Sequence, residues 1–204
     1  MGARDEQAPG FWERESPSLV VGVGASAGGL DACKKFLAAL PADSGMAFIL
    51  VQHLDPTHHS MMVELLAAHA PVKVQQATDG ALVQPNCVYT IPPGVYLSMD
   101  HGALRISTPS ERHGARLPFD FLLRSLADEV GERAVCVVLS GMGADGSLGA
   151  KAVKEKDGLV IAQDPDEADF DGMPRSAIKT GTVDLVLPAA EISAAIVRYN
   201  RRAT

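Results

Sequence analysis

Continuous apolar runs and amphipathic stretches follow one another along most of the chain. The strongest apolar runs, which predict buried strands, occupy residues 19–25, 47–51, 134–139 and 159–162. Such runs, without polar alternation, are typical of parallel strands that are covered on both faces. Apolar residues at helical spacing, which predict helices, occupy residues 28–40, 60–69, 119–130 and 147–156. This order of strands and helices predicts an α/β fold with a doubly wound, mainly parallel, Rossmann-like sheet.

Weaker signals complete the predicted domain. Residues 96–99 and 103–106 flank Asp100-His101-Gly102 and predict an inserted β-hairpin. Further strands are predicted at 72–76, 87–91 and 183–187, an acidic loop from Asp164 to Asp171, and a helical, then basic, end at 192–204. We expect a disordered leader at 1–17, one domain at 18–197 and a tail at 198–204.

The first apolar run leads into a glycine-rich turn that carries one serine. Gly24-Ala25-Ser26-Ala27-Gly28 fits G-x-S-x-G, the strand–turn–helix elbow that presents a nucleophilic serine. The overlapping segment Gly22 to Ala27 also fits G-x-G-x-x-A, a dinucleotide-binding turn. The motif alone leaves both interpretations open, although Gln52-His53 stands where an acidic ribose-binding residue is expected.

Two other predicted strand ends carry the partners that a nucleophilic serine needs. His53 follows the second buried strand, and Asp145 lies in the glycine-rich segment after the strand at 134–139. Neighbouring parallel strands lie about 4.8 Å apart, so we expect His53 beside Ser26. An imidazole would take the serine proton and a carboxylate would orient the imidazole. Backbone N–H groups at Ala27 and near Met142 are candidate donors to an oxyanion.

Structural roles for the same residues remain open. His53 is also compatible with a capped core histidine, and Asp145 with the start of the helix near Ser147. The other histidines have no metal spacing, and the acidic loop lacks the ligand pattern of a calcium-binding EF-hand. The sequence therefore predicts no metal site and no cofactor.

Charge and composition restrict the function classes further. The formal net charge of −7 argues against a nucleic-acid-binding surface. No apolar run is long enough to span a membrane, and the first residues lack a signal-peptide core. The three cysteines, Cys33, Cys87 and Cys136, lie in apolar segments and are expected to be buried, reduced thiols. We therefore expect a cytoplasmic protein that does not insert into membranes.

Four separated blocks of the sequence are distinctive: residues 21–29, 51–54, 140–146 and the stretches 162–164 to 172–174. In this order, they resemble the catalytic domain of CheB-type protein-glutamate methylesterases. The resemblance covers about residues 18–197 and implies a cofactor-free hydrolase of glutamyl methyl esters in chemoreceptors, with glutamine deamidation in many members. It implies Ser26 as nucleophile, His53 as base and Asp145 as orienting acid, with backbone oxyanion donors at Ala27 and Met142.

The sequence also departs from the family's usual pattern. Ala27 replaces the usual threonine after the serine, and Pro92-Pro93-Gly94-Val95-Tyr96 replaces a family stretch. These variants look like esterase domains fused to a CheR-type methyltransferase, and we see no receiver domain for phosphorylation control. The expected partners are a methylated chemoreceptor or similar sensory protein and a fused or separate methyltransferase. The alternative function is a non-catalytic, protein-binding sensory module that retains the fold.

Overall fold

The computed structural model describes residues 16–52, 61–108 and 117–203. Seven strands form one parallel sheet in the order β3-β4-β2-β1-β7-β8-β9. The strands are β1 (Val20–Ala25), β2 (Ala47–Gln52), β3 (Lys73–Gln76), β4 (Cys87–Thr90), β7 (Ala134–Val138), β8 (Leu159–Gln163) and β9 (Leu185–Leu187). The predicted parallel sheet is thus confirmed.

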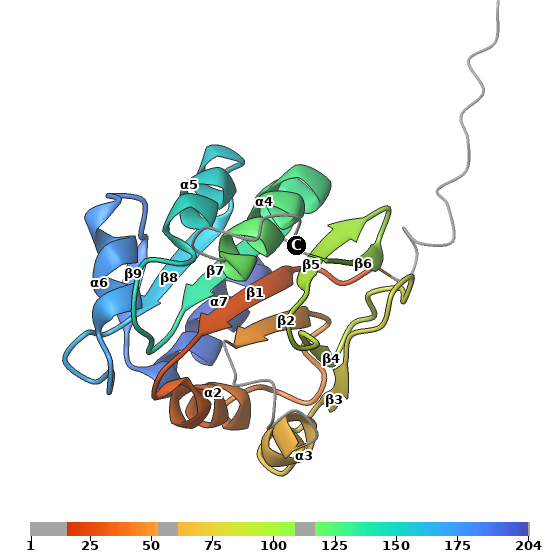
Figure 1. Cartoon of the computed structure of the whole chain (residues 1–204), viewed down its shortest axis with the longest axis horizontal. Coiled ribbons are helices and arrows are strands. Elements are labelled where there is room, and N and C mark those ends of the chain that lie inside the picture. The colour runs from red at the N-terminus through yellow and green to blue at the C-terminus, as the bar shows by residue number, and fades with distance from the viewer. Residues whose placement is uncertain (1–15, 53–60, 109–116, 204) are drawn as a thin grey trace, which may run out of the picture.

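Helices cover both faces of this sheet (Figure 1). One face packs against α2 (Gly29–Ala38), α3 (Met61–Ala67) and α7 (Ala189–Ala203). The other face packs against α4 (Pro118–Val130), α5 (Ser147–Glu155) and α6 (Gly172–Lys179). The central strands β1, β7 and β8 are buried along their whole length, which explains why their sequences are continuous apolar runs.

The predicted insertion is present as a separate antiparallel pair, β5 (Tyr96–Asp100) and β6 (Ala103–Ser107). Its turn is at His101 and Gly102, which both have positive φ. The short 3₁₀ turn η2 (Gly131–Arg133) links α4 to β7. The hairpin's apolar side joins the core formed by α4, and β5 packs along that helix, where the N–H groups of Met99 and Gly102 donate to Ser125 and Glu129.

The sequence did not predict α6. Its eight residues begin with a glycine and include Pro174, a combination that suggests a loop. Pro174 is tolerated because it lies in the first turn, where backbone N–H groups have no helical partner. Met173 and Ala177 are buried against the sheet, so tertiary packing stabilises this short helix.

The connections change direction between β1 and β7. The chain leaves β1 for α2 on one face, whereas it leaves β7 for α5 on the other. In open parallel sheets, ligands bind beyond the carboxyl ends of two such diverging strands. Ser26 follows β1 at this point, and the segment from Ser140 to Asp145 follows β7.

Candidate active site at the carboxyl ends of β1 and β7

Ser26 lies on a tight turn between β1 and α2, as the G-x-S-x-G motif predicts. Its N–H donates to the carbonyl oxygen of Ser140 (3.0 Å), and its carbonyl oxygen accepts a hydrogen bond from Gly29 N–H (2.9 Å). Gly28 completes the turn with a φ of 67°, a left-handed conformation that favours glycine. Ser26 is half-buried, beyond the carboxyl end of β1 and before the amino end of α2.

The loop after β7 packs directly against this turn. The Ser140 hydroxyl donates to the carbonyl oxygen of Ala27 (2.9 Å) and accepts from the N–H of Phe170 (3.1 Å). A Cβ on Gly141 would lie 2.9 Å from Ser26 Cβ and 2.3 Å from Met173 Sδ. The absence of a side chain at Gly141 therefore allows the two loops to meet.

Asp145 is almost fully buried, with 3% of its surface exposed. Its two carboxylate oxygens accept hydrogen bonds from the N–H groups of Phe119 (3.0 Å) and Asp120 (2.9 Å), in the first turn of α4. Helix amino ends have N–H groups without helical partners, and Asp145 supplies acceptors for two of those of α4. The suggestion that Asp145 caps the helix near Ser147 is wrong, because Gly146 is the N-cap of α5 and Asp145 caps α4.

Phe119 connects Ser26 and Asp145 through the core. A Cβ on Gly24, two residues before Ser26, would lie 2.1 Å from the Phe119 ring. A Cβ on Gly146, directly after Asp145, would lie 2.5 Å from the same ring. The ring therefore occupies space that both glycines leave free, and it brings the end of β1 and the Asp145 loop to one place.

The same contact decides between the two interpretations of the glycine motif. Gly22 and Gly24 lie within β1 and face Leu123 and Phe119 of α4. They permit close packing between a strand and a helix, and they do not form a phosphate-binding turn. The geometry therefore disfavours the dinucleotide site.

The structure describes the predicted oxyanion donors but not the predicted base. His53 lies outside the described residues, so its place beside Ser26 stays a prediction; Gln52, directly before it, pairs in register with Ala25. The N–H groups of Ala27 and Met142 donate to no acceptor within residues 16–52, 61–108 and 117–203. Both remain candidate oxyanion donors on the two loops that meet at Ser26.

A polar network behind Ser140, which is buried at Gln163 and reaches the surface at Lys35, was not predicted. Gln163 at the end of β8 accepts from the Ser140 N–H (2.7 Å) and donates to Glu167 (2.6 Å). Glu167 also accepts from the N–H of Ala189 (3.0 Å) and pairs with Lys35 (3.3 Å). Burial raises the pKa of Glu167, but these hydrogen bonds outweigh it and the pKa is lowered. The sequence feature that could have indicated this network is a polar residue at the end of an apolar strand, as at Gln52-His53.

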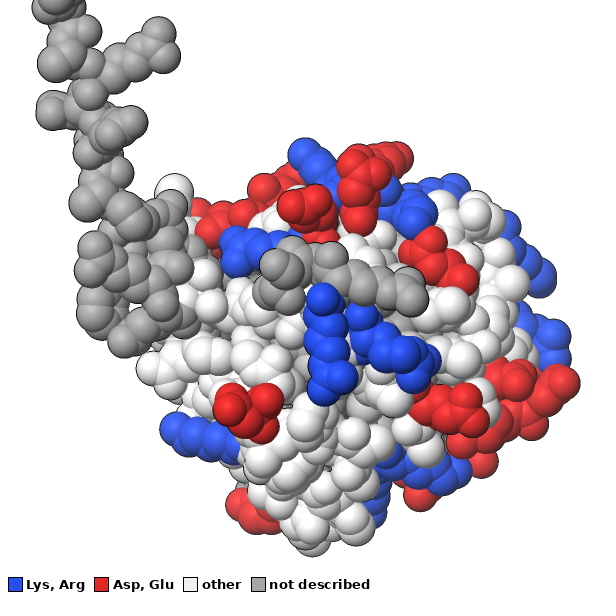
Figure 2. Space-filling view, turned by 180° about the vertical axis from the view of Figure 1, so that it is seen from behind, with Lys and Arg blue, Asp and Glu red and all other residues white. Residues whose placement is uncertain are grey.

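Other parts of the molecule offer no competing centre among the described residues. They contain no cluster of three or more histidine, cysteine or acidic residues that could hold a metal, and no helix long and apolar enough to cross a bilayer. The three cysteines are free and buried, as predicted. On the face shown in Figure 2, basic and acidic side chains are interspersed, as on an ordinary solvated surface.

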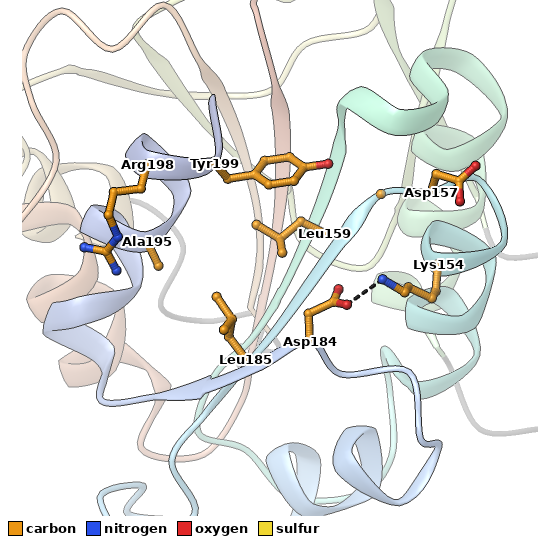
Figure 3. Close-up of a pocket in the computed structure, with 9 residues that line it drawn as sticks. Lys154, Asp157, Leu159, Asp184, Leu185, Ala195, Arg198 and Tyr199 are labelled. Carbon is orange, nitrogen blue, oxygen red and sulfur yellow. Dashed lines mark hydrogen bonds and ion pairs between the residues drawn. The ribbon is translucent and has the colours of Figure 1, made fainter. Parts of the chain in front are cut away.

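A pocket of about 370 Å³ lies at the opposite end of the sheet (Figure 3). It opens at Leu159, the first residue of β8, between Tyr199 of α7 and an ion pair of Lys154 with Asp184. The described residues that line it include no serine, histidine or cysteine. The chemistry-bearing residues therefore lie at the carboxyl ends of the strands, away from this pocket.

The fold and the turn define an α/β protein with a serine elbow at the point where its strand connections diverge. Residues 21–196 match the family described as CheB methylesterase. A protein-glutamate methylesterase/protein-glutamine glutaminase of Myxococcus xanthus (strain DK1622) is 36% identical over 192 residues, 91% of this chain and 55% of that protein. The chain belongs to the CheB methylesterase family, as the sequence blocks indicated.

The structural comparison agrees with the family assignment. The CheB methylesterase catalytic domain of Thermotoga maritima superimposes with a TM-score of 0.83 and 31% identity, over 89% of this chain and 98% of that one. An uncharacterised 104.1 kDa protein of Rhodobacter capsulatus is 42% identical over 138 residues, 68% of this chain but 14% of that protein. The chain spans about half the length of the methylesterase relatives, 55% and 56% of the first two.

Proposed function

We propose that this chain is a serine hydrolase that removes methyl esters from glutamate side chains of chemoreceptor-like proteins. The observation that carries the proposal is the meeting of the Ser26 turn with the Ser140–Asp145 loop at the carboxyl ends of β1 and β7. Membership of the CheB methylesterase family supports the choice of ester. The cytoplasmic location and a fused or separate CheR-type methyltransferase partner stay predictions.

In the proposed reaction, Ser26 Oγ attacks the ester carbonyl carbon while His53 takes the hydroxyl proton. Asp145 orients the imidazole and stabilises its protonated form. The negative oxygen of the tetrahedral intermediate accepts hydrogen bonds from the N–H groups of Ala27 and Met142. The intermediate collapses, His53 returns the proton to the methoxy oxygen, and methanol leaves.

A water molecule then attacks the acyl-enzyme by the same route. His53 takes a proton from water, and the bond between the glutamyl carbonyl and Ser26 Oγ breaks with return of that proton to the serine. The products are a free glutamate side chain and the original enzyme. No step requires a metal or an organic cofactor.

The same acyl-enzyme can form from a glutamine side chain, with ammonia in place of methanol as the leaving group. The relatives from Myxococcus xanthus and Geobacillus kaustophilus carry both methylesterase and glutaminase in their names. We therefore extend the proposal to deamidation of receptor glutamines, which ammonia release from an unmethylated receptor would test.

The primary experiment measures methanol release from a methylated chemoreceptor by wild-type protein and Ser26→Ala. We expect the Ser26→Ala rate to fall by at least about 10³-fold, because the nucleophile is lost. Mass spectrometry of protein treated with a serine-reactive organophosphonate should locate the adduct on Ser26, with none in His53→Ala. Equal release by both proteins would overturn the assignment. A folded wild-type protein with neither release nor adduct would favour the non-catalytic sensory module.

A further inference from the structure

Asp120 is a buried acid that the proposed mechanism does not use. It lies in the first turn of α4 with 4% of its surface exposed. Its Oδ1 accepts a hydrogen bond from the N–H of Gly149 (2.6 Å), in the first turn of α5. Its Oδ2 is buried and has no hydrogen-bond partner among the residues that the structure describes. Such a group costs stability, because burial removes water from a polar atom.

Two carboxylates link the amino ends of α4 and α5 by hydrogen bonds. Asp145, two residues before α5, accepts from the N–H groups of Phe119 and Asp120 in α4. Asp120, in α4, accepts from Gly149 in α5. Three hydrogen bonds thus link α4, the Asp145 loop and α5, and the position of the Asp145 carboxylate depends on how the two first turns sit together.

The two helix amino ends are closely packed. A Cβ on Gly149 would lie 2.5 Å from Leu123 Cβ, so the two helices approach each other at a residue that only glycine fits without a shift. Gly146 is equally close to the Phe119 ring, at 2.5 Å. Because dense interiors transmit small displacements, a change at the Asp120–Gly149 hydrogen bond would move the loop that carries Asp145.

The charges around Asp120 do not explain its burial. Burial raises the pKa of Asp120, the hydrogen bond from Gly149 opposes this, and the charge of Asp145 raises it further. The charge of Arg124, one turn along α4, lowers the pKa of Asp120, and the charge of Asp120 in turn raises the pKa of Cys136 in β7. The charge of a second acid beside Asp145 therefore destabilises the fold. Only the contacts that Asp120 makes favour its burial at this position.

We propose that Asp120 is a positioning residue, which holds the first turn of α5 against that of α4 and thereby fixes the Asp145 carboxylate. This inference rests on the proposed function, because Asp120 acts through the acid of the candidate triad. Asp120 contributes to catalysis through the position of its Oδ1 atom, which accepts from Gly149, and not through its charge.

Two substitutions separate position from charge. Asp120→Asn keeps the shape and an oxygen acceptor for Gly149 but removes the charge. Asp120→Glu keeps the charge but adds a methylene that displaces the acceptor. Asp184→Glu makes the same change at an exposed acid and serves as a control, because Asp184 also accepts from a backbone N–H, that of Val160 (2.9 Å), beside the pocket at the opposite end of the sheet (Figure 3).

The experiment measures kcat and KM for methanol release from a methylated chemoreceptor, together with the rate of organophosphonate labelling of Ser26. We expect Asp120→Asn to keep kcat within about threefold of wild type. We expect Asp120→Glu to lose about tenfold or more in kcat and in labelling rate with KM unchanged, because a displaced catalytic group slows the chemical step. Asp184→Glu should leave both rates unchanged. Thermal unfolding of each variant identifies the temperature at which it is fully folded.

Three outcomes would overturn the positioning role: equal kcat in wild type and Asp120→Glu, equal losses in both Asp120 variants, or a loss confined to Asp120→Asn. The last outcome would indicate that charge is what matters. Wild-type protein that is neither active nor labelled would overturn the proposed function, and the role of Asp120 with it, so the two failures are distinguishable.

Discussion

The N–H of Ser26 donates to the carbonyl oxygen of Ser140, 3.0 Å away, and this hydrogen bond extends the pairing of β1 with β7 past the ends of both strands. The backbone of the candidate nucleophile is therefore fixed by a hydrogen bond that continues the sheet. Its neighbours across this bond, Ser140 and Gly141, determine how closely the second loop approaches it.

Gly141→Ala should lower kcat strongly and the free energy of unfolding only slightly. The added methyl group would lie 2.9 Å from Ser26 Cβ and 3.1 Å from its backbone nitrogen, so the Ser26 turn must move. We expect a loss of about 10²-fold in kcat for methanol release, because small misplacements of reacting groups are costly.

Gly158→Ala is the matched control for this change. Its methyl group would lie 2.5 Å from the carbonyl oxygen of Ala134, at the opposite end of the sheet. It should lower the unfolding midpoint and leave kcat of the folded protein unchanged. A Gly141→Ala protein with wild-type kcat would contradict the close contact between the two loops.

Ser140→Ala should destabilise the nucleophile turn. The hydroxyl donates to Ala27 and accepts from Phe170, and its loss leaves both backbone groups without this partner. We expect a loss of about 1–3 kcal/mol in the free energy of unfolding and a slower labelling of Ser26. Ser193→Ala removes another buried hydroxyl, which donates to the carbonyl oxygen of Phe36, and should lower stability alone. Identical labelling rates in both variants would contradict the role of Ser140.

Glu167→Gln should make stability less dependent on pH. The pKa of Glu167 is lowered in the folded protein, where the hydrogen bonds from Ala189, Gln163 and Lys35 outweigh the effect of burial. A lowered folded pKa means that the carboxylate stabilises the protein fully above its ordinary value of 4.5, and that this contribution is lost as the pH falls through the folded pKa.

Urea unfolding of wild type and Glu167→Gln across this pH range tests the effect. Wild type should be the more stable protein at pH 7, and the difference between the two should shrink below about pH 4.5. A difference that stays constant or grows on acidification would show that the Glu167 carboxylate is not stabilised by its neighbours.

The buried thiols should be unreactive in the native protein. Burial raises the pKa of Cys33 to about 12, and burial followed by the charge of Asp120 raises the pKa of Cys136 as well. The thiolate is the reactive form, so we expect no modification by iodoacetamide at pH 8 before unfolding, and modification of Cys33 and Cys136 afterwards, as read by mass spectrometry. Rapid native-state modification of Cys33 would contradict its burial.

Local pattern was sufficient to predict most of the sheet and the serine turn. The runs at 19–25 and 134–139 are apolar throughout because both faces of those strands are covered. Gly28 signals the tight turn because its left-handed backbone favours glycine. The helix at 172–179 was missed because its sequence has weak local preference and its stability comes from packing.

The sequence by itself determined the residue types available for chemistry and the strand ends that carry them, since these follow from local periodicity and turn preferences. Only the tertiary structure decided that Asp145 accepts from the first turn of α4, since a hydrogen bond between residues 25 apart in sequence leaves no local pattern. It also decided that Gly24 and Gly146 meet one Phe119 ring, because close approach depends on three segments that only folding brings together.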